Sequence, residues 1–132
     1  MQIVQGTLDD LLACLPLIKE KIPEKAGLSE AEVVERLEGK RHGIILAKEE
    51  EKIEGITAWY EEDGVYMWLG AVIRPGRMLG SAMLETLLRT QPSHRYHTKI
   101  KRENEMAMRV LQKYGFEEYS RENGVSYMER LK

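Results

Sequence analysis

Three short runs of β-branched and aromatic residues follow one another in the middle of the chain, at residues 44–47, 53–60 and 65–73. Residues of these types favour strands, and the segments that separate the runs are short enough for hairpins. The second connection ends in Asp63 and Gly64, a pair that suits a turn with positive φ. The pattern therefore predicts a three-stranded antiparallel meander.

Two helices are predicted before the meander. Thr7 and Asp10 form a capping-box pair, and apolar residues then recur at the spacing of a helical face. Pro16 interrupts this face, so either the helix is kinked there or its first turn is separate. Ser29 and Glu32 form a second capping box, which marks the start of the next helix. A short apolar run ahead of the first helix predicts an opening strand.

The second half of the chain alternates between helix and strand patterns. Helices are predicted at residues 79–89 and 103–114, with a strand at 95–100 between them and a closing hairpin at 116–121 and 125–131. The complete order is β-α-α-β-β-β-α-β-α-β-β. A meander combined with a helical crossover predicts an α+β, or mixed α/β, fold whose central mixed and mostly antiparallel sheet is flanked by helices.

Length and charge limit the classes of function. A chain of 132 residues with an apolar fraction of 42% can build one core, so we expect a single domain over residues 1–132. Lysine and arginine total 20 against 22 for aspartate and glutamate, which gives a formal net charge of -2. The sequence therefore lacks the global basic field that binds phosphate backbones, and no nucleic-acid partner is expected.

The cysteine content and the start of the chain predict where the protein works. Cys14 has no second thiol for an internal disulfide, which favours a reducing, cytoplasmic setting. The first residues lack a basic segment followed by an apolar run, and no stretch approaches the roughly 20 apolar residues that a membrane span requires. We therefore expect a soluble cytoplasmic protein without a membrane partner.

The connection over residues 72–81 has the form of an anion site. A predicted strand runs there into a glycine-containing loop that opens a helix, where unpaired N–H groups converge and the helix dipole is positive. Gly76 and Gly80 allow close approach of the backbone, and Arg74 and Arg77 add positive charge. Such a site favours a pyrophosphate group. The alternative is a connection that uses glycine only for tight packing.

A second segment has a regular spacing of its own, in which Asn104, Ala107 and the pair Gly115 and Phe116 follow at fixed intervals. The two segments together resemble the signature segments of the GNAT superfamily of acetyl-CoA-dependent N-acyltransferases. The order of elements resembles the GNAT fold over essentially the whole chain. The second segment has the family's spacing without gaps.

The first segment departs from the family's pattern, which is an Arg or Gln, two residues, a Gly, one residue, and then a Gly or Ala. When the pattern is anchored on Gly80, Pro75 stands at the Arg or Gln position and Met78 at the middle glycine. When it is anchored on the proline that is common before this loop, Pro75 matches but the loop is shorter than usual. Pro75 lacks an N–H and the Met78 side chain can crowd a phosphate, so both alignments weaken the expected grip on pyrophosphate.

The resemblance implies acetyl-CoA as the acyl donor and an amine as the acceptor. It places the pyrophosphate in the loop and the pantetheine arm along the strand that ends at Ile73. The cofactor is then expected to enter between this strand and the strand that begins near Arg95. The cofactor-binding residues implied by the resemblance are Val72, Ile73, Arg74, Gly76, Arg77, Met78, Leu79, Gly80, Ser81, Asn104, Ala107 and Leu111.

The resemblance also suggests catalytic groups. The family often has a tyrosine at the position of Leu111, which protonates the departing thiolate; here Tyr114 is the candidate acid, or else a core residue. Glu62 is the candidate base that deprotonates the amine, with Glu61 and His97 as further candidates. A solvated turn is the alternative for both glutamates, and a solvent-facing position is the alternative for His97. The sequence shows no cluster of metal ligands.

Two functions are therefore predicted. The first is an N-acyltransferase in which the amine attacks the thioester directly and backbone N–H groups near residues 69–72 polarise the carbonyl. The alternative is a catalytically weak or inactive GNAT-fold protein that acts as a binding or interaction module, which the short loop and the missing tyrosine favour. The acceptor is not identified, because neither residues 23–28 nor the turn at Asn123 and Gly124 carry a recognisable motif. Exposed edges of the last strands are expected to permit a homodimer.

Overall fold

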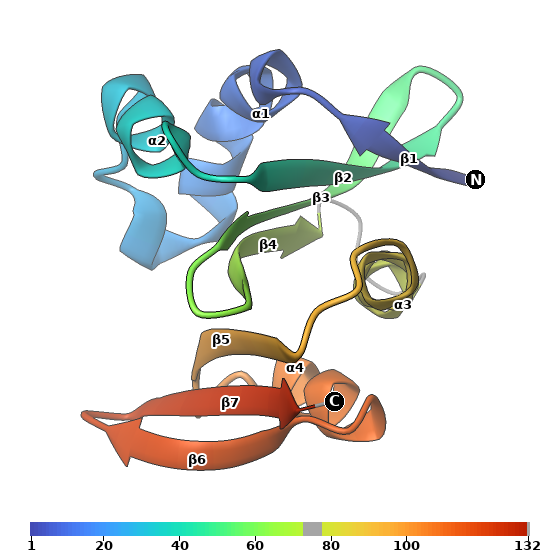
Figure 1. Ribbon diagram of the computed structural model, residues 1–132. Helices are drawn as coiled ribbons and strands as arrows, with labels where there is room; N and C mark the ends of the chain where they lie inside the picture. Colours follow the sequence, from blue (N-terminus) through green and yellow to red (C-terminus); the bar gives the residue numbers. More distant parts are fainter. Residues whose placement is uncertain (73–77, 132) are drawn as a thin grey trace.

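The computed structural model describes residues 1–72 and 78–131. Within them the elements follow the predicted order, which confirms the mixed α/β fold class (Figure 1). The elements are β1 (Gln2–Gly6), α1 (Leu8–Lys21), a short 3-10 helix (Pro23–Lys25), α2 (Glu30–Leu37), β2 (His42–Glu49), β3 (Lys52–Glu61), β4 (Val65–Val72), α3 (Leu79–Thr90), β5 (Arg95–Lys101), α4 (Glu105–Lys113), β6 (Glu117–Glu122) and β7 (Val125–Leu131).

The strands of the described residues form one seven-stranded sheet in the order β1-β2-β3-β4-β5-β7-β6. Neighbouring strands pair antiparallel except for β4 and β5, which run parallel. α3 lies between these two strands in the chain and makes the crossover that a parallel pair requires. The sheet is thus mixed and mostly antiparallel, as the sequence predicts.

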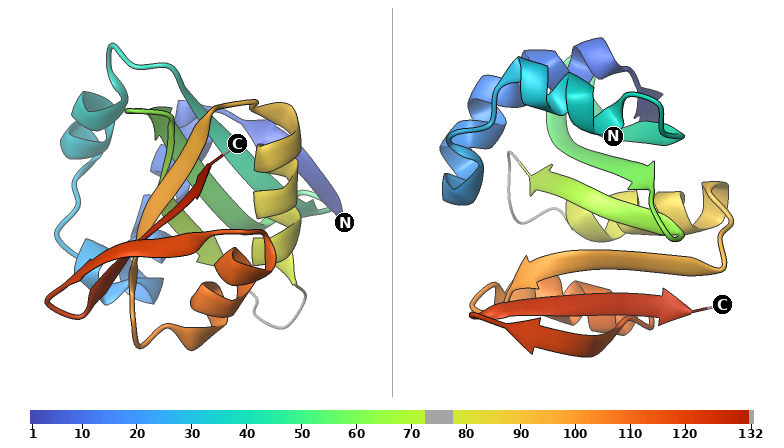
Figure 2. Two further views of the ribbon diagram at one scale, coloured as in Figure 1. Left: turned by 60° about the horizontal axis from the view of Figure 1, so that its bottom comes forward. Right: turned by 60° about the vertical axis from the view of Figure 1, so that its left-hand side comes forward.

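The two faces of the sheet are covered by different helices (Figures 1 and 2). Leu11 and Ile18 of α1 and Leu37 of α2 are buried against apolar residues of β2, β3 and β4 on one face. Met83 and Leu87 of α3 are buried in a second cluster on the other face, to which α4, β5 and β7 also contribute. The apolar face of each helix therefore sets its position on the sheet. Within residues 1–72 and 78–131, no helix is long and apolar enough to span a membrane.

Local sequence signals account for the starts of the first two helices. The Asp10 N–H donates to the Thr7 hydroxyl at 3.2 Å, and the Thr7 N–H donates to the Asp10 carboxylate at 2.8 Å, so the predicted capping box is present. The Glu32 N–H donates to the Ser29 hydroxyl at 3.2 Å at the start of α2. α1 is continuous through Pro16, so its first turn is not separate.

The turn between β3 and β4 is held close to β5. Asp63 and Gly64 both have positive φ, at 53° and 101°, as their sequence predicts. A side chain at Gly64 would collide with the carbonyl oxygen of Arg95, the first residue of β5. Glycine is therefore required here both for the backbone angle and for the close approach of the turn to β5.

Candidate active site

β4 and β5 lie side by side only at their first residues. Val65 pairs with Tyr96 and Tyr66 with His97, and the ladder between the two strands ends there. β5 continues to pair with β7 as far as Lys101. The right-hand view of Figure 2 accordingly shows the ribbons of β4 and β5 moving apart toward their C-terminal ends. The two strands predicted to flank the cofactor therefore do separate.

A β-bulge in β4 accompanies the separation. Met67 pairs with Trp59 of β3 and Leu69 with Ala58, so Trp68 has no partner of its own. Trp68 and Leu69 consequently both lie in the cluster under α1 and α2, whereas Met67 lies in the cluster on the other face. Because an extra residue bends the strand that carries it, the bulge explains why β4 turns away from β5 at this point.

The separation leaves one side of β4 without a strand partner. The Thr98 hydroxyl donates to the carbonyl oxygen of Met67 at 2.7 Å, and beyond this bond no described strand pairs with β4 on the side of β5. Gly70 is exposed there between two buried neighbours. Since backbone N–H and C=O groups require partners, this edge is available to water or to an extended ligand. The opening lies beside the C-terminal halves of both strands, whereas the Arg95 end of β5 remains joined to its neighbours.

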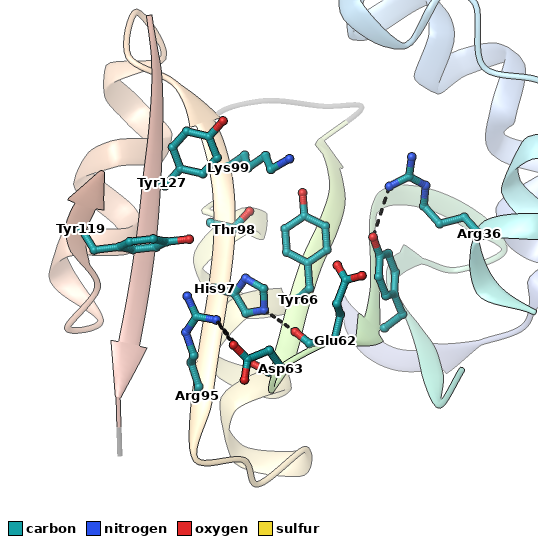
Figure 3. A pocket seen from close by; sticks show the side chains of 11 residues that line it. Arg36, Glu62, Asp63, Tyr66, Arg95, His97, Thr98, Lys99, Tyr119 and Tyr127 are labelled. Carbon is teal, nitrogen blue, oxygen red and sulfur yellow. Dashed lines mark hydrogen bonds and ion pairs between the residues drawn. The ribbon is translucent and has the colours of Figure 1, made fainter. Parts of the chain in front are cut away.

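A cavity of about 290 Å³ lies beside the β4–β5 junction, on the face covered by α1 and α2 (Figure 3). We call it the β4–β5 pocket. One wall is formed by Arg36 of α2, Tyr60 of β3 and Tyr66 of β4, and the opposite wall by side chains of β5, β6 and β7. The turn between β3 and β4 closes one end with Glu62 and Asp63. The pocket is therefore assembled from both halves of the sheet.

His97 of β5 projects into the β4–β5 pocket. Its Nε2 atom lies 2.6 Å from the backbone carbonyl oxygen of Glu62. A carbonyl oxygen can only accept a hydrogen bond, so the neutral ring carries its hydrogen on Nε2, and Nδ1 is left as a proton acceptor. Burial lowers the pKa of His97 below its ordinary value and outweighs the bond to Glu62, which acts in the opposite direction. The ring is therefore a neutral base at pH 7.

Tyr66 lies next to His97, with the two ring centroids 5.0 Å apart. Its other neighbour is Tyr60, whose ring it meets edge-on at 5.2 Å. Burial, with a contribution from Tyr60, raises the pKa of Tyr66 to about 12. The phenol therefore keeps its proton at neutral pH and offers a hydrogen-bond donor inside the pocket.

Arg95 joins the parts of the protein that meet at the closed end of the pocket. Its guanidinium donates to the Asp63 carboxylate at 3.0 Å and to the Glu129 carboxylate of β7 at 2.9 Å. Only 16% of the Arg95 side chain is exposed. The β3–β4 turn, β5 and β7 are thus held together by one cation, whose charge two carboxylates balance.

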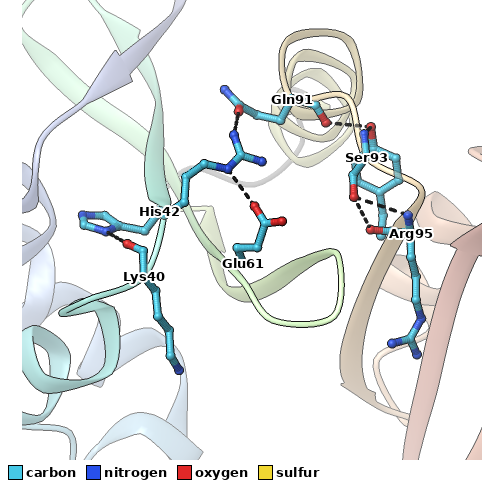
Figure 4. A network of polar contacts seen from close by, with 8 residues as sticks. Lys40, His42, Glu61, Gln91, Ser93 and Arg95 are labelled. Atoms are coloured by element: carbon cyan, nitrogen blue, oxygen red, sulfur yellow. Dashed lines mark hydrogen bonds and ion pairs between the residues drawn. The ribbon is translucent and has the colours of Figure 1, made fainter.

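The two glutamates predicted as candidate bases lie in different surroundings. Glu61 accepts a hydrogen bond from Arg41 at 2.7 Å, and Arg41 also donates to the side chain of Gln91, in a network outside the pocket (Figure 4). Glu62 lines the pocket, and its carboxylate is 3.9 Å from the ammonium of Lys40. Of the two, Glu62 is the one that a ligand in the pocket would meet.

The same architecture occurs in solved structures of other proteins. No protein-family model matches the chain, and no curated protein matches it. The PaiA N-acetyltransferase from Thermoplasma acidophilum, in complex with coenzyme A, is 13% identical with a TM-score of 0.76, and the match covers 100% of both chains. Aminoglycoside 6'-acetyltransferase type Ii is 14% identical with a TM-score of 0.74, and the match covers 99% of this chain and 97% of that one. An acetyltransferase of the GNAT family from Streptococcus pneumoniae is 17% identical with a TM-score of 0.74, and the match covers 98% of both chains.

This chain has the GNAT fold. The similarity extends over nearly the whole chain, so the element order predicted from the sequence and its resemblance to this fold are confirmed together. At these identities the similarity establishes the fold, and the chemistry has to be argued from the residues that the GNAT fold brings together here.

The GNAT-fold loop before α3 carries most of the predicted cofactor residues. Val72 ends β4, and Met78, in the left-handed region with φ of 56°, precedes α3 without making a side-chain cap. Leu79 and Ser81 are buried, and a Cβ added at Gly80 would have no atom of the described residues within 4 Å. The first N–H groups of α3 are therefore not satisfied by its N-cap side chain, which suits an anion site. The remaining predicted residues of this loop lie outside the described residues: Ile73, Arg74, Gly76 and Arg77.

The second GNAT-like segment lies on α4. The Ala107 N–H donates to the side-chain oxygen of Asn104 at 3.2 Å, so Asn104 caps this helix. Leu111 is buried in the cluster that faces α3. Tyr114 follows the last turn of α4, and its hydroxyl donates to the carboxylate of Glu85 on α3 at 3.3 Å. Tyr114 does not line the β4–β5 pocket, and its role as an acid stays a prediction.

Several residues of the β4–β5 pocket are not predicted from the sequence. Tyr119 reaches the pocket from a bulge in β6, where it has no partner of its own in β7, and its ring packs 5.3 Å from the Arg95 guanidinium. One signal is present in the sequence, because alternation along a strand places Lys99 on the same face as His97. The lining residues that the sequence does not predict as functional are Arg36, Tyr60, Asp63, Tyr66, Arg95, Thr98, Lys99, Tyr119 and Tyr127.

Proposed function

We propose that this protein is an acyl-CoA-dependent N-acyltransferase that moves an acetyl group from acetyl-CoA to an amine held in the β4–β5 pocket. The observation that carries the proposal is the position of this pocket beside the point at which β4 leaves β5. His97, a proton acceptor, belongs to the last ladder pair of β4 and β5, where the unpaired edge begins, and Glu62 supplies a carboxylate in the lining of the same pocket. Acyl transfer from a thioester to an amine requires a base for the amine and donors for the carbonyl oxygen, and this arrangement supplies candidates for both.

The described residues fit a coenzyme A thioester. Pantetheine is an extended chain with amide groups, and the unpaired edge of β4 offers backbone donors and acceptors to such a chain. The Met78 side chain does not cap the N–H groups at the start of α3, and these groups are the proposed donors to a pyrophosphate. We therefore retain the cofactor-binding residues that the sequence suggested: Val72, Met78, Leu79, Gly80, Ser81, Asn104, Ala107 and Leu111, together with Ile73, Arg74, Gly76 and Arg77 outside the described residues.

Acetyl-CoA supplies the acetyl group as a thioester, and the residues of this chain prepare the amine for attack. The Glu62 carboxylate attracts the protonated amine, and Nδ1 of His97 takes its proton. The neutral amine forms the new C–N bond as the C–S bond breaks. The nitrogen then releases its second proton to solvent, and the sulfur takes up a proton from Tyr114 and leaves as a thiol. Backbone N–H groups in residues 69–72 are the proposed donors to the carbonyl oxygen while negative charge develops on it.

Tyr114 is the proposed donor of the proton that the departing sulfur takes up, since Leu111 has none to give. Desolvation and then the nearby Glu85 raise the pKa of Tyr114, so its hydroxyl stays protonated at neutral pH. Tyr114→Phe should lower kcat, whereas Glu85→Gln keeps a hydrogen-bond acceptor and should change kcat little. Wild-type kcat in Tyr114→Phe would remove this residue from the mechanism.

Calorimetry with acetyl-CoA tests the cofactor directly. A Cβ added at Gly80 meets no atom of the described residues within 4 Å, so neither Gly80→Asp nor Gly80→Asn should disturb their packing. Aspartate at this position favours the helix through its dipole and repels a pyrophosphate, whereas asparagine has the same shape without the charge. We expect Gly80→Asp to weaken acetyl-CoA binding at least about tenfold, or about 1.4 kcal/mol, relative to Gly80→Asn. Absence of saturable binding to the wild-type protein would contradict the proposal.

A second candidate function is a GNAT-fold binding protein without turnover. The observation that favours it is the buried Leu111 at the position where the family often has a tyrosine. Mass spectrometry of the purified protein, together with an assay of thiol release, separates the two. Bound coenzyme A together with thiol release in the presence of amines would support the transferase. The absence of both properties would favour the binding protein.

A further inference from the structure

Two cationic side chains line the β4–β5 pocket from opposite walls. Arg36 comes from α2 and Lys99 from β5, and Figure 3 shows both extending toward the space between the walls. Among residues 1–72 and 78–131, neither has a carboxylate within ion-pair distance. Each charge is therefore available to a ligand.

Aromatic rings hold both cations in place. The Arg36 guanidinium lies 5.1 Å from the ring centre of Trp68 and donates one hydrogen bond to the hydroxyl of Tyr60 at 3.2 Å. The Lys99 ammonium lies 5.6 Å from the ring centre of Tyr127. Contact with an aromatic face orients a cation without neutralising it, and a guanidinium has further N–H groups to donate. The two side chains are thus ordered and still charged.

The third cation of the pocket behaves differently. Arg95 is paired with Asp63 at 3.0 Å and with Glu129 at 2.9 Å, so its charge is already balanced within the protein. Glu62 is the remaining carboxylate among the described residues of the pocket lining. The free positive charges of the lining therefore exceed its free negative charges, although the whole chain has a formal net charge of -2. Tyr66 adds a protonated phenol, which can also donate to an anion.

We propose that the acceptor is a small amine that also carries an anionic group, such as an amino acid, and that Arg36 and Lys99 bind this anion. The inference rests on the proposed function, since it names the substrate class of the same site. A cavity of about 290 Å³ is at the lower end of the range for small-molecule sites, which suits a molecule of amino-acid size. Glu62 and His97 remain for the amine, at the end of the pocket that the β3–β4 turn closes.

Matched pairs of probes test the anion. Phenylalanine, tyrosine, leucine and lysine are each compared with the amine that remains when the carboxylate is removed. Calorimetry without acetyl-CoA measures binding, and thiol release with acetyl-CoA measures kcat/KM. Because hydrogen bonds to charged groups contribute more than neutral ones, we expect at least one amino acid to exceed its decarboxylated partner about tenfold or more in both measurements.

Variants assign the preference to the two cations. Lys99→Gln and Arg36→Gln should each reduce the ratio between the two members of a pair severalfold. Arg109→Gln is the matched control, because Arg109 is 81% exposed on α4, and its nearest carboxylate, Glu105, is 4.0 Å away. This control should keep the wild-type ratio. Unfolding curves of all three variants show whether each is folded. Lys99 is an exposed strand residue, so Lys99→Gln should fold and can test the proposal even if Arg36→Gln is unstable.

The outcomes separate this inference from the proposed function. Decarboxylated amines that react as well as the amino acids would overturn the inference and leave the N-acyltransferase intact. Amino acids that bind through Arg36 and Lys99 without thiol release would support the anion site and count against the transferase. An amino-acid preference that survives in Lys99→Gln and Arg36→Gln, or no binding of any amino acid in the panel, would overturn the inference.

Discussion

The Nε2 atom of His97 lies 2.6 Å from the backbone carbonyl oxygen of Glu62, and this one contact selects the tautomer of the ring. Because the hydrogen has to lie on Nε2, the lone pair of the neutral ring is on Nδ1. The same contact fixes the orientation of the ring and ties β5 to the β3–β4 turn. Position and protonation state of the proposed base thus have a common structural origin.

Acidification should switch the proposed base off. Burial places the pKa of His97 below its ordinary value of 6.5, so the ring accepts protons at pH 7 and loses this ability only when the pH falls below that value. We expect kcat/KM to decline with falling pH through an inflection below 6.5 that belongs to His97. His97→Gln should lower the rate about a hundredfold and remove the inflection.

His42→Gln is the matched control for the pH profile, because His42 also bonds to a backbone carbonyl, that of Lys40, and does not line the pocket. It should retain both the rate and the inflection. A profile in which His97→Gln keeps the inflection would assign the titration to another group.

Gly70→Val should separate acetyl-CoA binding from stability. An added side chain at Gly70 would meet the Thr57 hydroxyl only at 4.0 Å, and valine is favourable in a strand, so we expect the free energy of unfolding to stay within about 0.5 kcal/mol of wild type or to rise. The new side chain crowds the open edge of β4, and the Kd for acetyl-CoA should increase at least about tenfold, or about 1.4 kcal/mol. Gly27→Val, which also has open space but lies between α1 and α2, should bind acetyl-CoA as wild type does. Unchanged binding in Gly70→Val would mean that the cofactor does not lie along this edge.

Thr98→Val should destabilise the junction of the two half-sheets. Thr98 is buried and its hydroxyl satisfies the carbonyl oxygen of Met67 at 2.7 Å, so an isosteric methyl leaves that oxygen without a partner. We expect urea unfolding to show a loss of about 1–3 kcal/mol. Thr90→Val removes a hydroxyl that bonds to the Thr86 carbonyl on the exposed surface of α3, and it should cost less than about 0.5 kcal/mol. Equal costs for the two variants would show that burial of the Met67 oxygen is not the cause.

A double-mutant cycle should show that Arg95 and Glu129 are coupled. Their side chains are only 16% and 23% exposed and lie 2.9 Å apart, so solvent screens the pair weakly. Arg95→Gln should cost about 1.5–3 kcal/mol in the free energy of unfolding, and the cycle with Glu129→Gln should give a coupling of about 0.5–3 kcal/mol. The exposed pair Arg109 and Glu105 should give a coupling below about 0.5 kcal/mol in the same experiment. A similar value for both pairs would argue against a special role for Arg95 at the pocket.

The sequence predicts the fold well because the relevant signals are local. Thr7 and Asp10 predict the start of α1, and Asp63 and Gly64 predict the turn into β4. Each of these signals lies within four consecutive residues. The bulge at Trp68 is different, since β4 is buried on both faces and its continuous apolar run has no alternation from which an extra residue could be recognised. The point at which β4 leaves β5 therefore emerges only from the structure.

The acceptor side of the site depends on contacts between distant parts of the chain. Arg36 on α2 and Lys99 on β5 are far apart in the sequence. They line one pocket because α2 packs against β3 and β4, whereas β5 belongs to the other half of the sheet. His97 is recognisable in the sequence as a candidate base, but its bond to Glu62 depends on the approach of the turn to β5. Ile73, Arg74, Gly76 and Arg77 lie outside the described residues, and their roles stay predictions.

The bond between the Ala107 N–H and the Asn104 side chain also bears on how such chains evolve. Selection for a stable α4 is enough to keep an asparagine at this position, whether or not coenzyme A is ever bound, because loss of a helix cap costs about 1 kcal/mol. A descendant that had abandoned catalysis would still retain this part of the signature. The asparagine is thus a record of ancestry and folding, while the proposed activity makes a separate demand on His97, whose Nδ1 atom takes no part in the contact with Glu62.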